Sequence, residues 1–328
     1  MKKFVNRVDD ILTEALRGFG AAHGDVVKVN VEPTYVTRAT ATKRGKVALI
    51  SGGGSGHEPL HAGFVGLGML DAACPGAVFT SPTPDQMAAA AQAVNAGPGV
   101  LFIVKNYEGD VMNFEMATEL LDCPHATVLT NDDVAVENST YTTGRRGVAG
   151  TVVVEKMIGA AAEESRPLPA LKELGDTVNG RTRSMGVALT SCTVPAAGKP
   201  TFELGGDEIE MGVGIHGEPG RRRVKHKAAD GIAAEMMTAI TGDLGAKAGS
   251  DVLLLVNGYG GTPAMELYVM YDAARRQLAA KGLKATRSLV GNYCTSLEMA
   301  GCSLTVTALD AELTRLWDAP VHTAALRW

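Results

Sequence analysis

The sequence has few aromatic residues, few cysteines and no long apolar run. Phenylalanine, tyrosine and tryptophan make up 5% of its 328 residues, which favours closely packed helices, sheets and glycine turns over an aromatic-rich sandwich. The five cysteines are odd in number and form no CxxC pair, so we expect reduced, buried thiols and no disulfide framework. No apolar stretch reaches the ~18 residues of a membrane-spanning helix, which predicts no membrane span.

The sequence also lacks a basic balance of charge and a secretory leader. The net charge of -5 at pH 7 provides no electrostatic footprint for nucleic acid. Residues 1–16 carry Asp9, Asp10 and Glu14 where a signal peptide needs an apolar run, and they are typical of an amphipathic helix. We therefore expect a cytoplasmic protein that binds neither nucleic acid nor membrane. One basic run, at 221–227, predicts either a solvated loop or a docking patch for an acidic partner.

Short apolar runs alternate with helical patterns along the chain. Strands are predicted at 46–50, 99–104, 126–129, 186–189 and 251–256, and helices between them at 85–94, 147–164 and 264–280. This alternation predicts an α/β fold with two α/β domains, each with a central, largely parallel or mixed sheet flanked by helices. The polar segment 176–184 precedes a new strand, so we place the domains at 1–183 and 184–328.

Three polar segments follow predicted strands, at 51–59, 105–110 and 257–263. Because ligands in α/β folds bind beyond the carboxyl ends of strands, these segments are candidate site loops. The first, SGGGSGHEP, allows positive φ angles, close approach of a ligand to the backbone, and an anion-binding nest of N–H groups. It lacks the glycine spacing of a dinucleotide fingerprint, and no P-loop motif occurs in the chain. The segment therefore predicts a site for a small polar ligand.

The segment from His57 to His61 matches the HExxH pattern of zinc proteases. That pattern needs both histidines on one face of a helix, whereas glycines precede His57 and Pro59 fits only a first helical turn. We expect His57 at or before a helix cap and no metal site. His57 is then either a structural cap or a histidine that contacts ligand and transfers protons.

Two further segments carry chemically useful side chains. The sequence GVGIHGEPG places His216 between Gly214 and Gly217, which suits either a plain turn or an accessible imidazole. The sequence KNYEGD begins with Lys105 and ends with Asp110, and it could bind hydroxyl groups by charge-assisted hydrogen bonds or be an ordinary polar turn. The residues alone leave both alternatives open.

These segments together resemble the DhaK subunits of bacterial dihydroxyacetone kinases. The resemblance spans nearly the whole chain and includes KVALISGGGSGHEPLHAGFVGLGML, VKNYEGDVMNFEMATELL, GRRGVAGTV, GVGIHGEPG, NYCTSLEMAG and LWDAPVHTAAL. It implies that the chain binds dihydroxyacetone for phosphorylation to dihydroxyacetone phosphate.

The resemblance also implies roles for individual residues. His216 would attack the ketone and hold the substrate as a hemiaminal, and His57 and Asp110 would be the other catalytic residues. Lys105 and Asp110 would contact the substrate, and the backbone of Gly54, Ser55 and Gly56 would cradle it. A neutral imidazole is a suitable nucleophile near pH 7, and glycerol has no carbonyl for it to attack. Which of His57 and Asp110 is the base stays open.

The family keeps its nucleotide on a separate, all-helical DhaL part. We therefore expect no cofactor or metal on this chain, ADP or ATP with Mg on DhaL, and no activity without that partner. The phosphoryl source would be phosphoenolpyruvate through DhaM, or ATP, and a homodimer is expected. Two alternatives remain: a kinase subunit for a four-carbon ketose such as erythrulose, and a ketose-sensing coactivator. Retention of both His57 and Asp110 favours the enzyme.

Overall fold

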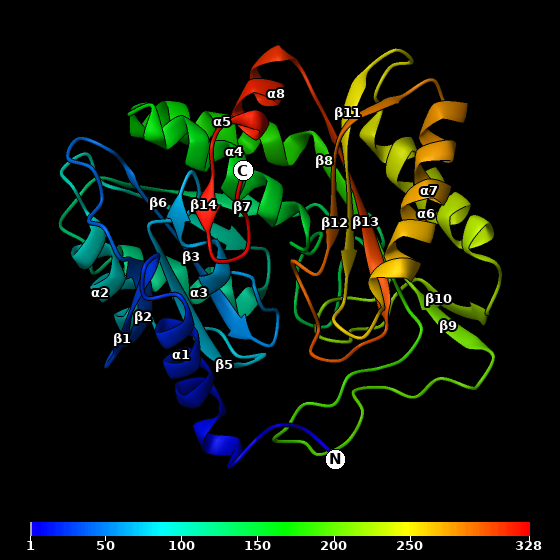
Figure 1. The fold of residues 1–328 in the computed structure, drawn as a ribbon, viewed down its shortest axis with the longest axis horizontal. Coiled ribbons are helices and arrows are strands. Elements are labelled where there is room, and N and C mark those ends of the chain that lie inside the picture. Colours follow the sequence, from blue (N-terminus) through cyan, green and yellow to red (C-terminus); the bar gives the residue numbers. More distant parts are fainter. Residues whose placement is uncertain (1) are drawn as a thin grey trace.

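The computed structural model describes residues 2–328 as alternating layers of helices and sheets (Figure 1). The first six-stranded sheet has the order β1-β2-β5-β3-β6-β7. Its strands are β1 (Val27–Val31), β2 (Thr34–Arg38), β3 (Ala48–Ser55), β5 (Ala72–Val78), β6 (Val100–Lys105) and β7 (His125–Thr130). The central strands β5, β3, β6 and β7 pair in parallel, and β1 and β2 add an antiparallel edge.

The second six-stranded sheet has the order β10-β9-β8-β13-β11-β12. Its strands are β8 (Thr182–Ala188), β9 (Glu208–Met211), β10 (Arg222–Lys225), β11 (Asp251–Gly258), β12 (Lys284–Gly291) and β13 (Gly301–Ala308). Only β11 and β12 pair in parallel, so this sheet is mixed. The α/β class with helix-flanked sheets is therefore confirmed. The chain enters the second sheet at Thr182, and the division into 1–183 and 184–328 stays a prediction.

Helices cover both faces of each sheet. Helices α2 (Pro84–Val94) and α3 (Glu108–Thr118) pack on the outer face of the first sheet, and α6 (Ala229–Leu244) and α7 (Ala264–Ala280) on that of the second. Between the sheets lie α4 (Gly150–Glu163), α5 (Leu168–Gly180) and α8 (Ala311–Asp318). The short elements are η1 (Val8–Asp10), η2 (Ala62–Phe64), β4 (Gly66–Leu67) and β14 (His322–Thr323). Among residues 2–328, no helix has the length and apolar character to cross a bilayer.

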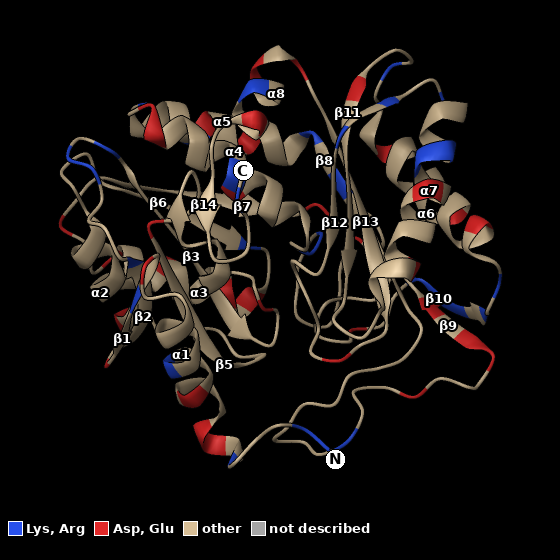
Figure 2. Cartoon of the chain, viewed as in Figure 1, with Lys and Arg blue, Asp and Glu red and all other residues tan. Residues whose placement is uncertain are grey.

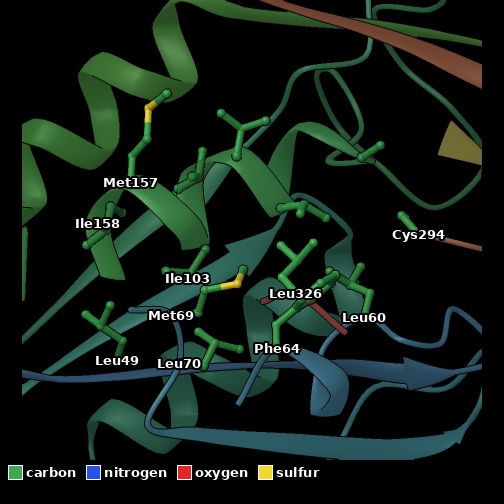
Figure 3. Packing of buried hydrophobic residues seen from close by; sticks show 14 of the residues in the cluster. Leu49, Leu60, Phe64, Met69, Leu70, Ile103, Met157, Ile158, Cys294 and Leu326 are labelled. Carbon is green, nitrogen blue, oxygen red and sulfur yellow. The ribbon is translucent and has the colours of Figure 1, made fainter. Parts of the chain in front are cut away.

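Helix α4 is the centre of the largest hydrophobic core. All its residues from Gly150 to Ala162 are buried, because one side of the helix faces the first sheet and the other faces the second. Figure 3 shows Met157 and Ile158 of α4 above Leu49 of β3 and Ile103 of β6. Each such side chain contributes about 1.5–3 kcal/mol when it leaves water. This burial joins the two sheets into one structure.

Two local expectations are wrong. Gly52, Gly53 and Gly54 lie inside β3 and not in a loop, because glycines let the neighbouring backbone approach closely and the pairing with β5 continue. A Cβ atom at Gly52 would lie 2.6 Å from the carbonyl oxygen of Cys74. No α-helix follows His57 either, since only the short η2 forms there. At the amino end, the predicted amphipathic helix begins later, as α1 (Ile11–Ala22), and Met1 lies outside the described residues.

The basic run at 221–227 is neutralised locally. Arg222 and Lys227 form ion pairs with Glu235 on α6, and Arg223 pairs with Glu210 of the adjacent strand β9. Figure 2 shows the basic segment of β10, in blue, beside the acidic segment of β9, in red. These pairs support the solvated-surface interpretation over a docking patch for an acidic partner.

Candidate functional site

A pocket of about 430 Å³ lies where the carboxyl ends of β3 and β6 face the second half of the chain. The first half contributes Gly54, Phe79 and Asp110 to its wall, and the second half contributes Thr201 and His216. The position agrees with the rule that ligands of α/β folds bind beyond strand ends. The pocket therefore depends on both sheets.

The two histidines singled out in the sequence meet beside this pocket. The Nε2 atoms of His57 and His216 lie 3.0 Å apart, although the residues are 159 positions apart in the chain. Nδ1 of His57 lies 2.7 Å from the carbonyl oxygen of Thr295, so it carries a proton and donates it. Burial and the charges of His216 and Lys105 lower the pKa of His57 well below its ordinary value. His57 therefore readily gives up any proton that its Nε2 atom holds.

Glu218 orients His216, and the sequence analysis missed it. Its Oε1 lies 2.9 Å from Nδ1 of His216, and its Oε2 accepts the backbone N–H of the same residue at 2.9 Å. Although burial alone would raise the pKa of Glu218, the charges of His216 and Arg146 lower it to about 2. An ionised carboxylate keeps a proton on Nδ1 of His216 and leaves Nε2 as the reactive atom. The signal was an acidic residue two positions after the histidine in the same glycine-rich turn.

The hydrogen bonds of the two rings leave one proton to be shared. Nδ1 of His57 and Nδ1 of His216 both donate, so in their neutral forms both Nε2 atoms would be acceptors. Two lone pairs repel at 3.0 Å, and the contact is favourable only with a single proton between the rings. The pair can thus release a nucleophile and a proton at the same place.

Aromatic rings fix the orientation of this pair. The ring of Phe79 stacks on His57 with 5.0 Å between the ring centroids, and it meets His216 edge-on with a centroid distance of 5.1 Å. The ring of Tyr107 also meets His216 edge-on, with a centroid distance of 4.6 Å. Phe79 has a φ of 55°, in the left-handed region that costs a non-glycine residue about 1–2 kcal/mol. Nothing in the local sequence distinguishes Phe79 from an ordinary core aromatic residue, whereas Tyr107 lies inside the KNYEGD segment singled out in the sequence.

Lys105 and Asp110 lie together on the other side of the pocket. Nζ of Lys105, at the end of β6, is 3.4 Å from Oδ2 of Asp110 in the first turn of α3. The hydroxyl of Ser81 donates to Oδ1 of Asp110 at 2.5 Å. A carboxylate in a first helical turn is favoured by the helix dipole. A Cβ atom at Gly53 would lie 2.3 Å from Nζ of Lys105, so only glycine leaves the lysine its place.

The remaining predicted residues differ in their position. Gly54 lines the pocket directly. Ser55 and Gly56 only shape the backbone, because the Ser55 hydroxyl donates to the carbonyl oxygen of Gly76 at 2.7 Å and the Gly56 N–H donates to the Glu58 carboxylate at 3.0 Å. Asp110 and His216 line the pocket with Gly54, and Lys105 and His57 lie directly behind them.

The two histidines of the HExxH pattern do not face a common point. His57 contacts His216, whereas Nδ1 of His61 lies 2.6 Å from Oε1 of Glu155 and its Nε2 lies 3.1 Å from Nζ of Lys105. Within residues 2–328 no group of three or more metal-binding side chains gathers. The zinc-protease geometry is absent from this segment.

Comparisons with known proteins agree with the pattern of this site. A Dak1 domain matches residues 17–325. The PEP-dependent dihydroxyacetone kinase, dihydroxyacetone-binding subunit DhaK of Escherichia coli is 48% identical and covers 100% of this chain and 99% of its own. The structure of the dihydroxyacetone kinase operon co-activator Dha-DhaQ is 34% identical over 95% of this chain and 96% of its own, with a TM-score of 0.89.

A third relative is longer than this chain. The native dihydroxyacetone kinase of C. freundii is 31% identical with a TM-score of 0.86, and the match covers 98% of this chain but 60% of that one. The match to the Dak1 domain and the full-length likeness to a DhaK subunit both extend over almost every element described above. The chain therefore belongs to the Dak1 domain family, together with the dihydroxyacetone-binding DhaK subunits.

Proposed function

We propose that this chain is the dihydroxyacetone-binding subunit of a dihydroxyacetone kinase and holds its substrate covalently on Nε2 of His216. The observation that carries the proposal is the orientation of His216. Glu218 fixes Nδ1, His57 faces Nε2, and the ring borders a pocket large enough for a short ketose. Full-length likeness to the named DhaK subunit of Escherichia coli supports the choice of ketose.

The proposed addition needs no external reagent. The Nε2 lone pair of His216 forms a bond to the carbonyl carbon, and the π electrons of the carbonyl move to its oxygen. That oxygen takes the shared proton from Nε2 of His57, which becomes neutral, and the product is the hydroxyl of a hemiaminal. The His216 ring gains positive charge, which the ionised Glu218 balances. The bound ketose is thereby fixed in one orientation for the next step.

The second step transfers a phosphoryl group to the terminal hydroxyl of the ketose. Asp110, or His57, accepts the hydroxyl proton as its oxygen attacks phosphorus. Lys105 sits beside Asp110 and would contact the substrate. We infer that the nucleotide, ADP or ATP with Mg, is carried by a DhaL partner, with phosphoenolpyruvate through DhaM or ATP as the phosphoryl source.

A second candidate function is ketose sensing. It is favoured by the 34% identity to a structure named as an operon co-activator. Sensing needs the adduct on His216 but no proton transfer at Asp110. The buried placement of Asp110 against Ser81 and Lys105, at the pocket wall, supports the kinase subunit. A four-carbon ketose such as erythrulose would use the same bond to His216.

Intact mass spectrometry tests the covalent bond. We expect the wild-type chain to gain the mass of one ketose with dihydroxyacetone, and no mass with glycerol, which has no carbonyl. His216→Ala should show no gain, whereas the matched control His226→Ala, at an exposed histidine of the second half, should behave as the wild type. Erythrulose in parallel ranks the substrates. An adduct in His216→Ala would overturn the proposal.

Addition of a DhaL partner and its phosphoryl donor separates the two candidates. A kinase subunit forms dihydroxyacetone phosphate only when that partner is present. A chain that forms the adduct but no phosphate ester with the partner would instead be a sensor.

A further inference from the structure

A buried chain of polar side chains runs from Asp110 away from the pocket into the core. Nζ of Lys105 lies 3.1 Å from Nε2 of His61, and Nδ1 of His61 lies 2.6 Å from Oε1 of Glu155 on α4. Lys105, His61 and Glu155 are all buried. The path therefore links a carboxyl group between the two sheets to the carboxylate at the pocket wall.

The donors and acceptors along this path fix the state of His61. A lysine ammonium only donates, so Nε2 of His61 must accept, and the ring proton lies on Nδ1. The Ser51 hydroxyl, 3.0 Å from Nδ1, donates to the carbonyl oxygen of Ile103 and cannot also donate to the ring. Burial and the charges of Lys105 and His57 lower the pKa of His61 well below its ordinary value. His61 is therefore a neutral ring that donates a hydrogen bond from Nδ1 to Glu155 and accepts one at Nε2 from Lys105. Glu155 thereby fixes the orientation of the acceptor that holds Lys105.

Packing does not explain Glu155. It lies in the fully buried stretch of α4, and its Oε2 has no hydrogen-bond partner among the described residues. Burial raises the pKa of Glu155 to about 8, against the opposite effect of the Lys105 charge. An apolar side chain of similar size usually costs a core less than a carboxyl group. We therefore attribute the buried carboxyl group of Glu155 to the hydrogen bond that it makes with Nδ1 of His61.

We propose that Glu155 and His61 are positioning residues that hold the Lys105 ammonium in place between Gly53 and Asp110. The Asp110 carboxylate thereby keeps the orientation that it needs to receive the proton of the substrate hydroxyl. This inference rests on the proposed function, because it assigns the pair a role in the transfer step. The addition to His216 should not depend on it, since His216 is held by Glu218 and His57 on the other side of the pocket.

Two substitutions of Glu155 separate positioning from packing. Glu155→Leu keeps the size but removes the acceptor, and we expect kcat with the DhaL partner to fall roughly 10-fold, the usual scale for one buried hydrogen bond. KM and the adduct on His216 should stay near those of the wild type. Glu155→Gln keeps an acceptor oxygen and should restore kcat at pH 7 to within about 3-fold of the wild type.

The pH profile provides a readout that a structural role would not change. The polar and titratable groups around Glu155 are His61, Ser51 of β3, Lys105 at the end of β6, and Cys294. Besides burial, the charge of Glu155 helps to raise the pKa of Cys294. When protonated, Glu155 can donate a hydrogen bond to Nδ1 of His61. This favours the His61 tautomer with its proton on Nε2, which faces the Lys105 ammonium and repels it. Its ionisation above about pH 8 removes that form, so kcat of the wild type should rise through this pH. Glu155→Gln should lack the rise.

The control is the next residue on the same helix. Lys156 is also buried, but it donates to the carbonyl oxygen of Leu316 on the opposite side and its pKa is lowered by burial to about 8. Lys156→Met therefore tests both general damage to α4 and a second group that titrates near the same pH. It should keep the kcat and the pH profile of the wild type.

The outcomes are distinguishable. Wild-type kcat in Glu155→Leu, or an unchanged pH profile in Glu155→Gln, would overturn the inference. If Glu155→Leu does not fold, ¹⁵N NMR of the wild-type histidines above pH 8 decides, because a proton on Nε2 of His61 while Glu155 is ionised contradicts the proposed chain. If the wild type forms no adduct and no phosphate ester, the proposed function fails, while the NMR spectrum still tests the state of His61.

Discussion

At the scale of single residues, the reactivity of His216 depends on Glu218. The carboxylate accepts from Nδ1 at 2.9 Å and balances the charge that the ring acquires in the adduct. Glu218→Gln keeps the shape but removes the charge, and a hydrogen bond to a charged group contributes about 1.5–3 kcal/mol. We therefore expect dihydroxyacetone to bind about 10- to 100-fold more weakly, as measured by the ketose concentration that gives half-maximal adduct in intact mass spectrometry.

Glu203→Gln is the matched control for this prediction. Glu203 is an exposed acidic residue of the loop that precedes β9, so its loss should leave adduct formation unchanged. If Glu218→Gln binds ketose as tightly as this control does, Glu218 does not support the adduct.

The residues of the site were predictable to different degrees. His57 and His216 stand out in the sequence because each lies in a glycine-rich segment, but only the resemblance connected them. Their 3.0 Å contact joins segments that follow strands of different sheets, which no local pattern encodes. Glu218 could have been found from its place in the same turn. Phe79 could not, because its role depends on a backbone conformation with φ of 55°.

At the scale of elements, strand β3 carries the site because its end is made of glycines. A Cβ atom at Gly54 would lie 2.5 Å from the Thr80 nitrogen and 2.8 Å from backbone atoms of Phe79. Gly54→Ala should therefore displace the aromatic ring that packs on both histidines. We expect a loss of about 1–3 kcal/mol in the free energy of unfolding, as for other overpacked sites, measured by denaturant titration.

The control for this substitution is Gly18, in the middle of α1. A Cβ atom there meets nothing within 4 Å, and alanine is the better helix former by up to about 1 kcal/mol. Gly18→Ala should be neutral or stabilising. Equal stability of Gly54→Ala and the wild type would show that the contact between β3 and the 79–80 backbone is not close-packed.

The same element shows where prediction from sequence is limited. Helix α7 was predicted with its observed bounds, because a long amphipathic segment between turn residues is a strong local signal. β3 extends into residues that were expected to form a loop, because glycine has low strand propensity and only pairing with β5 reveals the strand. The antiparallel pairing of β8 with β13 joins residues more than a hundred positions apart, and local patterns do not encode such pairs.

At the scale of the whole molecule, the proposed adduct would form where the two halves meet. The backbone N–H groups of Thr295 and Leu297 donate to the carbonyl oxygens of His57 and Gly56, so the second half already holds the glycine-rich segment of the first. A ketose bonded to His216 and in contact with Asp110 would add a bridge between the halves. Binding to the folded state alone should therefore raise the stability of the entire chain.

This coupling is measurable as a shift in the melting temperature. At a ketose concentration about 100-fold above Kd, linkage predicts about 2.7 kcal/mol of added stability, or several degrees in Tm. The shift should appear with dihydroxyacetone and be absent with glycerol at the same concentration, because only a carbonyl can accept Nε2 of His216. His216→Ala should lose the shift as well. An equal shift in that variant would mean that the pocket binds ketose through its polar wall alone, without the covalent bond.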